Sequence, residues 1–527
     1  MAPENFLRPL GKFETMSSSR HSLGFYRRVI STCTYEQAPS PTTGNDTQPL
    51  QQVVEAALAR VVLELPGLRI AIADESSLNP SFVAVPYIDI RGNHLEFVSL
   101  DHVDHEGGGN DSGGDPALMR FLEGEHGKLW PDVSARPPWK LTVVQRAGSP
   151  LLDVVFAAHH GITDGGGTAR FHAFLLRSLS ASSQLPSLPE LSPESGVLDC
   201  SAHRPNLAPE MSQLVKLDVS WLYLAKEIVK DMAPAWLSGT ARPWAGAPPN
   251  PEPYRTHLRL ITIAPESARV LKSACRAHQT TLTPLLHALV LVSLCRALPD
   301  GDRTSSELNF AADTPISLRP YMTRPLPAGI DESALAVPMV TTHRHLFSGS
   351  TVSRALASAN DEDDDDDDDE LVWSLAAEIK STLAQRQATL PRDDVAGLLP
   401  YSGDWRARWL AAAAKPRSGT WEISNLGAVP EAIAPKTGTG FAPRGEQQQQ
   451  QQQQQPTWRI TRIIFSQGTD VCGDAFALSV AGARDSGTIC VSINWQEGIL
   501  DGDLMDRFTD EFKALLERTG RAAARDT

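Results

Sequence analysis

The stretch that most constrains the fold is Ala157–Gly167, AAHHGITDGGG, which lies between an aliphatic run and a helical pattern. The residues before it, WKLTVVQRAGSPLLDVVFAAHH, predict two strands joined by the turn AGSP, and TARFHAFLLRSL after it predicts a helix. Glycines let the backbone turn sharply and expose a neighbouring side chain. We therefore expect the imidazole of His160 and the carboxylate of Asp164 to lie close together where a strand passes into a helix.

The local pattern allows two interpretations. In the first, His159 and His160 end a buried strand and Asp164 caps the helix that begins near Thr168. In the second, one imidazole is a general base, because its ordinary pKa of about 6.5 suits proton transfer near neutral pH. Of the 14 histidines, His160 is the one followed by Asp at the fourth position. From composition alone, the full HHxxxDG pattern is expected in about one chain in several hundred. Its presence here therefore favours the second interpretation, in which a histidine is a general base.

Adjacent residues of a strand point to opposite faces of the sheet. One of the two histidines is therefore expected to face a site and the other to be a buried, hydrogen-bonded residue that supports the sheet. For the same reason, His159 and His160 are not expected to ligate one metal ion together.

The length of 527 residues predicts two domains or one bilobal unit. The net charge is −15, but the ten acidic residues 361–370 account for ten of these charges and leave −5, with no basic stripe for nucleic acid. The six cysteines form no CxxC pair. The first residues do not resemble a secretion signal. No apolar run approaches the roughly 18 residues that a membrane-spanning helix needs. These features predict a soluble, cytoplasmic chain.

Composition divides the chain into three parts. We expect an N-terminal subdomain in residues 1–195 that carries HHxxxDG, a crossover helix and linker in 196–253, and a C-terminal subdomain in 254–527. The crossover helix is expected near Ser212 to Trp236, and its charges exclude a membrane span but leave contact with a membrane surface open. Poly-Asp (361–370) and poly-Gln (447–455) are expected to be disordered insertions.

Other motifs carry less weight. The loop DHVDHEGGGN, Asp101 to Asn110, contains potential metal ligands, but nothing in it fixes their geometry, so we expect a solvated loop and no metal. Nucleophile elbows, Walker loops and GxGxxG patterns are absent from the sequence. His287 lies in the middle of the apolar run LTPLLHALVLVSLCRAL and is expected to be a hydrogen-bonded core residue.

The chain resembles the acyltransferase superfamily that includes chloramphenicol acetyltransferases, peptide-synthetase condensation domains and fungal alcohol acetyltransferases. The resemblance to the last of these rests on HHGITDG together with RPLGKFE, GFYRRVISTCTY, PPWKL, TPISLRPYM, SNLG and VSINWQEG, which span nearly the whole chain. The DFGWG signature of plant-type acyltransferases is absent, which favours the fungal alcohol acetyltransferase branch.

This resemblance implies an α/β (α+β) fold. It consists of two chloramphenicol-acetyltransferase-like α/β sandwich subdomains with mostly antiparallel sheets and an active-site tunnel between them. Acetyl-CoA, or another acyl-CoA, would enter as a co-substrate from one side and the acceptor from the other, with no permanently bound cofactor.

The resemblance also implies roles for individual residues. His160 would be the general base, and Asp164 would pair with Arg319 to hold the loop. His159 and Gly165 would support the site. Ser424 and Asn425 are candidates for the oxyanion hole or the tunnel wall, while Asn425 as a simple turn residue remains the alternative.

The function expected from these features is acetyl-CoA:alcohol O-acetyltransfer to a small or medium hydrophobic alcohol, in ester biosynthesis of secondary metabolism. A first alternative is a condensation-type N- or O-acyltransferase that uses a carrier-protein thioester. A second alternative is a catalytically inactive binding or scaffold protein. We expect a cytoplasmic monomer, with peripheral attachment to endoplasmic reticulum or lipid droplets implied by some relatives.

Overall fold

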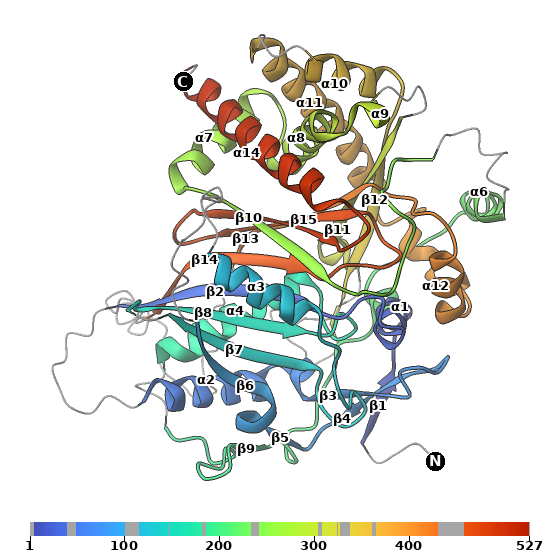
Figure 1. The fold of residues 1–527 in the computed structure, drawn as a ribbon. Coiled ribbons are helices and arrows are strands. Elements are labelled where there is room, and N and C mark those ends of the chain that lie inside the picture. The colour runs from blue at the N-terminus through green and yellow to red at the C-terminus, as the bar shows by residue number, and fades with distance from the viewer. Residues whose placement is uncertain are drawn as a thin grey trace.

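The computed structural model describes residues 5–38, 49–100, 115–146, 148–181, 186–232, 242–303, 308–323, 325–326, 338–360, 365–429 and 458–525 (Figure 1). Its two larger sheets are each covered by helices and lie against each other. The predicted α/β class with mostly antiparallel sheets is confirmed, because most neighbouring strands in both sheets run antiparallel.

The first sheet has five strands in the order β14 (Trp458–Gln467), β2 (Val29–Gln37), β8 (Leu151–Ala158), β7 (Trp139–Arg146) and β6 (Leu95–Leu100). The predicted hairpin before the histidines is confirmed as β7 and β8. The helices α2 (Leu50–Glu64) and α4 (Gly165–Ala181) pack with this sheet in one apolar core, whereas α3 (Pro116–His126) covers strands on the other side.

The second sheet has six strands in the order β10 (Thr256–Ile263), β16 (Ile489–Gln496), β15 (Phe476–Ala483), β13 (Trp421–Val429), β11 (Phe310–Ser317) and β12 (Val340–Phe347). One face packs against α7 (Pro265–Ala277), α8 (Leu282–Ala297), α10 (Ser350–Asn360), α11 (Asp365–Thr389) and α14 (Gly502–Arg525). The helix α8 is apolar on all sides and is correspondingly buried beneath its neighbours.

The remaining elements are short or peripheral. They are β1 (Phe6–Pro9), α1 (Lys12–Ser22), β3 (Ile70–Ala73), β4 (Ser81–Ala84), β5 (Tyr87–Asp89), β9 (Val197–Asp199), α5 (Met211–Leu214), α6 (Trp221–Met232), α9 (Asp300–Arg303) and α12 (Trp405–Ala413). Of these, α1 matters most for function, because it forms one wall of the cavity described below.

The strand β14 connects the two halves of the chain. It belongs to the C-terminal half of the sequence, yet it pairs with β2 along the edge of the first sheet and also contacts β15 and β16 of the second sheet. Its side chains alternate, so that Phe465 packs into the core of the first sheet and Ile464 into the core shared with β10. The division of the chain at 196–253 remains a prediction.

The predicted crossover helix is divided in two. Helix α5 ends at Leu214 and α6 begins at Trp221, because Val215 forms a β-bridge with Met322 and takes the chain out of the helical path. Residues 233–236 of the prediction lie outside the described residues. Figure 1 shows α6 at the periphery of the molecule, and Trp221, Leu222 and Val229 on it are exposed.

Of the acidic run 361–370, Asp365–Glu370 belong to helix α11, and its description as a disordered insertion stays a prediction. Asp369 accepts a hydrogen bond from Thr519 of α14 and lies 3.7 Å from Arg518. Residues 361–364 and the glutamine run 447–455 lie outside the described residues.

Among the helices that the structure describes, none is by itself long and apolar enough to cross a bilayer. By length and composition, α7 and α8 meet that criterion only as a pair, with a bend of 95° between them.

Candidate active site

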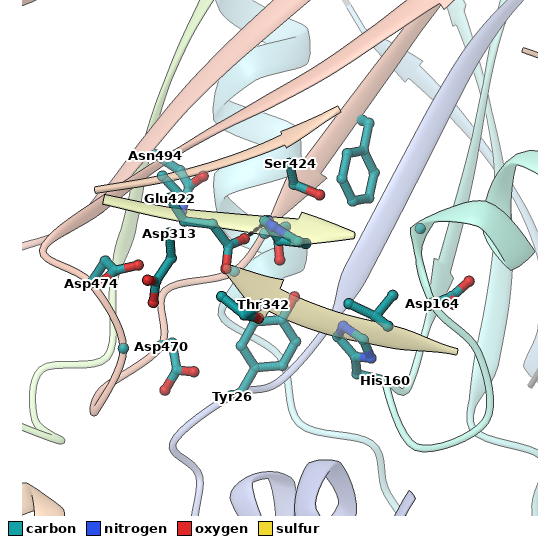
Figure 2. Close-up of a pocket in the computed structure, with 18 of the residues that line it drawn as sticks. Tyr26, His160, Asp164, Asp313, Thr342, Glu422, Ser424, Asp470, Asp474 and Asn494 are labelled. Atoms are coloured by element: carbon teal, nitrogen blue, oxygen red, sulfur yellow. Dashed lines mark hydrogen bonds between the residues drawn. The ribbon is translucent and has the colours of Figure 1, made fainter. Parts of the chain in front are cut away.

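The HHxxxDG segment lies where the sequence predicts it. Strand β8 ends at Ala158, helix α4 begins at Gly165, and the turn between them carries His160 and Asp164 (Figure 2). The helix begins three residues earlier than Thr168, so the three consecutive glycines form its first turn. Gly165 needs its missing side chain, because a Cβ there would lie 2.7 Å from Phe465 and 2.8 Å from Leu426.

The turn borders a cavity of about 700 Å³ between α1, the HHxxxDG turn and the second sheet. Strands β11 and β12 contribute alternate residues, as the period of two along a strand requires. They are Asp313, Pro315 and Ser317 of β11 and Val340, Thr342 and Arg344 of β12. The sheet also contributes Glu422, Ser424, Asn425, Leu426 and Val429 of β13, Phe476 and Ala477 of β15, and Asn494 and Trp495 of β16. The opposite face of this sheet packs into the helical core, so the cavity lies between the two halves of the fold.

His160 is the imidazole that faces the cavity. Its ring contacts the ring of Tyr26 edge-on, with centroids 5.5 Å apart. Within the described part of the chain, its Nδ1 has no hydrogen-bond partner. Burial, and next the positive charge of Arg20, lower the pKa of His160. The ring is therefore neutral, and able to accept a proton, at neutral pH.

Asp164 is buried and holds the turn in place. Its carboxylate accepts hydrogen bonds from the Arg319 guanidinium at 2.9 Å, the Met339 N–H at 3.1 Å and the Gly167 N–H at 2.9 Å. Burial alone would raise the pKa of Asp164, but Arg319 and the two N–H groups bring it below its ordinary value. Asp164 is thus both a helix cap and an ion-pair partner, and its carboxylate points away from His160 in Figure 2.

His159 points to the other side of the strand and is fully buried. Its Nε2 donates to Glu75 at 2.9 Å, and its Nδ1 accepts from the Gly161 N–H at 2.8 Å. Glu75 also accepts from Nδ1 of His21 at 3.0 Å, while Nε2 of His21 accepts from the Trp130 N–H. These backbone donors fix both ring tautomers and direct both ring protons at Glu75.

His21, Glu75 and His159 are close enough to be considered as metal ligands. However, the ring nitrogens that face Glu75 carry protons, whereas a metal needs a free lone pair. Burial, followed by the charge of His21, lowers the pKa of His159 to about 4, so this ring stays neutral. The cluster is best described as a hydrogen-bonded support beneath the turn.

The two oxyanion candidates differ. Asn425 donates from Nδ2 to Thr283 at 3.0 Å and accepts from the Gly427 N–H at 2.8 Å, where Gly427 has a φ of 72°. Its amide is therefore occupied in a turn, which is the alternative that the sequence left open. Ser424 and Asn425 both line the cavity from β13.

A functional candidate that sequence reasoning missed is Tyr26. It is 4% exposed, lines the cavity, and its hydroxyl has no hydrogen-bond partner among the residues that the structure describes. Burial keeps its pKa well above the ordinary value, so the hydroxyl remains a donor. The guanidinium of Arg20 lies 5.1 Å from the centre of its ring. The available sequence signal was its position in the family-like stretch GFYRRVISTCTY.

The sequence also missed a group of carboxyl residues at one end of the cavity, which we call the acidic end: Asp313, Glu422, Asp470 and Asp474. In Figure 2 the acidic end lies across the cavity from His160, with Tyr26 and Thr342 between them. Its members come from three separate segments of the chain, so no local motif predicts the group.

One other sequence prediction is tested by the structure, and a second one is not. His287 is fully buried, its Nε2 lies 2.9 Å from the Thr314 hydroxyl, and its Nδ1 accepts from the Trp421 indole N–H at 3.0 Å, which confirms a satisfied core residue. The loop from Asp101 to Asn110, weighed as a metal site, lies outside the described residues.

Comparison with known families and sequences gives a consistent result. The family model described as alcohol acetyltransferase matches residues 127–437. A probable alcohol acetyltransferase of Fusarium pseudograminearum, FCK4, is 27% identical over 97% of this chain and 95% of the relative. Another, crmB of Aspergillus fumigatus, is 23% identical over 94% of this chain and 96% of the relative.

Solved structures with a similar fold include acyl-transfer proteins of several kinds. The TRI3 trichothecene 15-O-acetyltransferase of Fusarium sporotrichioides superposes with a TM-score of 0.64 at 12% identity, covering 97% of this chain and 94% of its own. The wax ester synthase/diacylglycerol acyltransferase of Marinobacter aquaeolei VT8 gives 0.53 at 14% identity over 98% and 100%. The first condensation domain of the CDA synthetase gives 0.52 at 13% identity over 99% and 98%.

Proposed function

Since the chain belongs to the alcohol acetyltransferase family and is an acyltransferase, we propose that it transfers an acetyl group from acetyl-coenzyme A to the hydroxyl of an alcohol. The observation that carries this proposal is the neutral imidazole of His160, which faces a cavity between the two sheets. A base of this kind is what direct attack of a hydroxyl on a thioester requires.

The reaction follows from the position of the base. His160 accepts the hydroxyl proton as the alcohol oxygen attacks the thioester carbonyl, so a C–O bond forms and negative charge gathers on the carbonyl oxygen. Collapse of this intermediate breaks the C–S bond, and the protonated His160 returns the proton to the departing thiolate. The products are the ester and free coenzyme A, and no acyl-enzyme is formed.

The developing oxyanion needs hydrogen-bond donors, which are a major source of rate in acyl transfer. Two neutral hydroxyls that line the cavity are candidates, those of Tyr26 and Ser424. The unpartnered hydroxyl of Tyr26, beside the His160 ring, supports Tyr26 as the stronger one. Asn425 is less suited, because its amide already bonds Thr283 and Gly427.

The other site residues have positioning roles in this proposal. The Asp164–Arg319 ion pair holds the turn that carries His160. His159, tied to Glu75, supports the same turn from its buried side, and Gly165 allows Phe465 to approach it closely.

Acetyl-coenzyme A acts here as a co-substrate, and no permanent cofactor is part of the proposal. A purified sample offered acetyl-coenzyme A and a panel of alcohols and amines should release coenzyme A and form esters. Use of an acyl-loaded carrier protein in place of acetyl-coenzyme A would instead indicate condensation-type chemistry. Failure to bind any thioester, in a stably folded protein, would indicate a binding or scaffold role.

We extend the proposal to a cytoplasmic monomer that contacts membranes peripherally through α6. The exposed Trp221, Leu222 and Val229 support this extension, because aromatic and aliphatic side chains on one helix suit the interfacial region of a bilayer. Co-sedimentation with phospholipid vesicles, compared between the parent and a Trp221→Ser, Leu222→Ser double variant, tests it.

A further inference from the structure

The acidic end of the cavity is built on the floor formed by the second sheet. Asp313 of β11 and Glu422 of β13 are direct neighbours in register, so two carboxyl groups lie side by side on the cavity face. Asp470 and Asp474 come from the loop between β14 and β15 and complete the group. Like charges placed opposite each other in a sheet are destabilising, so this arrangement calls for compensation.

Arginines provide part of that compensation. Arg344 binds Asp313 through two hydrogen bonds of 2.6 and 2.8 Å and lies 3.8 Å from Asp474. Arg20 binds Asp470 at 2.5 Å. Arg417, which lies behind the lining, donates to main-chain carbonyls of this loop.

Within the described part of the chain, the hydrogen-bond donor to the Glu422 carboxyl group is a neutral one, the amide of Gln467 at 2.9 Å. Burial, and then the nearby Asp313 and Asp470, raise the pKa of Glu422 to about 7. Burial and Asp313 also hold the pKa of Asp474 well above its usual range. With all the neighbouring arginines in place, this end of the cavity therefore still favours added positive charge.

Asn494 of β16 gives an independent indication of a ligand. The side chain lines the cavity beside Glu422, as Figure 2 shows, and is only 3% exposed. Its Oδ1 is buried and has no hydrogen-bond partner in the described part of the protein. A buried acceptor without a donor is unfavourable, so its presence in a cavity wall points to a donor supplied from the cavity.

The chemistry of these groups identifies that donor. Carboxylates and an amide oxygen are acceptors, and an ammonium group is the complementary ligand, with a positive charge, three N–H donors and no acceptor. The carboxyl groups disfavour the anionic phosphates of coenzyme A at this end, whereas a cationic group on the acceptor is complementary to them.

We propose that the acidic end binds a basic nitrogen of the acceptor, so that the favoured acceptors are amino alcohols whose hydroxyl reaches His160 while their ammonium group lies near Glu422 and Asn494. This inference rests on the proposed function and narrows its acceptor from alcohols in general to alcohols that carry an amine. The ammonium group is protonated and is not the nucleophile, so the product is the O-ester.

The test compares two homologous series, ω-amino alcohols of three to ten carbons and 1-alkanols of matched length, with acetyl-coenzyme A as donor. We expect kcat/KM for the best amino alcohol to exceed that of its matched alkanol by about tenfold or more, with the ester identified by mass spectrometry. Glu422→Gln, which keeps the shape and the acceptor for Gln467, should lower that ratio about tenfold, and Asn494→Ala should lower it severalfold. Glu36→Gln, at an exposed carboxylate paired with Arg459 far from the cavity lining, is the matched control and should leave the ratio unchanged.

Calorimetry with the amino alcohols alone gives a reading that does not depend on turnover. Binding near pH 7 should release protons, because an ammonium group lowers the pKa of Glu422, and the release is measured by comparing buffers of different ionisation enthalpy. Glu422→Gln should abolish most of it. If amino alcohols and alkanols formed esters equally well and calorimetry detected no binding of amino alcohols, this inference would be overturned and the proposed function would stand. Binding that depends on Glu422, with no ester formed from any acceptor, would instead overturn the function and keep the site.

Discussion

Arg319 reaches across 155 positions of sequence to bind the buried carboxylate of Asp164 at 2.9 Å. The carboxylate belongs to the turn after β8, and the guanidinium to the short 3-10 helix Arg319–Tyr321 that follows β11. This ion pair therefore joins the two halves of the fold at the HHxxxDG turn.

Breaking this pair should destabilise the protein strongly. Arg319→Ala leaves the Asp164 carboxylate buried and uncompensated, and we expect the free energy of unfolding to fall by about 3–5 kcal/mol. Urea unfolding followed by fluorescence measures the change. Arg459→Ala, at an exposed pair with Glu36, is the matched control and should leave the free energy of unfolding nearly unchanged. Equal effects of the two substitutions would show that the buried pair does not hold the turn.

The pH dependence of the reaction should reflect the environment of His160. Its pKa is lowered by burial and by Arg20, while Asp164 and Asp470 act in the opposite direction. The base is active when neutral, so the acid limb of kcat/KM should lie at lower pH than the ordinary pKa of an imidazole would give. Arg20→Met removes the positive charge and leaves Asp470 without its partner, and both effects move this acid limb to higher pH. Arg20→Lys should keep it in place, and an unchanged limb in Arg20→Met would contradict the assignment.

Removal of the Tyr26 hydroxyl should lower the rate of the chemical step. Tyr26→Phe keeps the ring beside His160 but deletes the oxyanion donor, and we expect kcat to fall about 10²-fold with little change in KM. Thermal stability should not decrease, because the deleted hydroxyl has no partner within the described residues. If Ser424→Ala shows this loss and Tyr26→Phe does not, the donor is Ser424.

The cluster of His21, Glu75 and His159 should position the HHxxxDG turn without binding a metal ion. Glu75→Gln replaces an acceptor of two imidazole N–H groups by an amide with a single acceptor oxygen, and we expect about 1–3 kcal/mol of lost stability together with a lower kcat. The shorter Glu75→Asp keeps the charge and should recover part of kcat. Dialysis against a chelator should leave the melting temperature and the activity unchanged. A fall in either, reversed by zinc, would show that His21, Glu75 and His159 hold a metal ion.

Much of the fold could be predicted from the sequence because its signals are local. The apolar segments on either side of the turn AGSP predicted β7 and β8, and the helical pattern after the glycines predicted α4. The prediction of the crossover helix was less successful, because the bridge from Val215 to Met322 is a tertiary contact that overrides the local pattern.

The residues of the candidate site also fall into those that the sequence predicted and those that it did not. His160 and Asp164 lie within one motif, and Arg319 was named through the family resemblance in ISLRP. The acidic end could not be found along the chain, because its partners are distant in sequence: Arg20 and Asp470 are 450 positions apart. Tyr26 lies in the family-like stretch GFYRRVISTCTY, but the His160 ring that it contacts is distant in sequence. Only the pairing of β11 with β13 brings Asp313 beside Glu422.

The central claim is that His160 is the base of the acyl transfer. The most direct measurement is ester formation from acetyl-coenzyme A and an alcohol acceptor by purified His160→Ala, with folding verified by circular dichroism and thermal unfolding. We predict that turnover falls by about 10²–10⁴-fold while the protein remains folded. Ester formation at the parent rate by the folded variant would contradict the account.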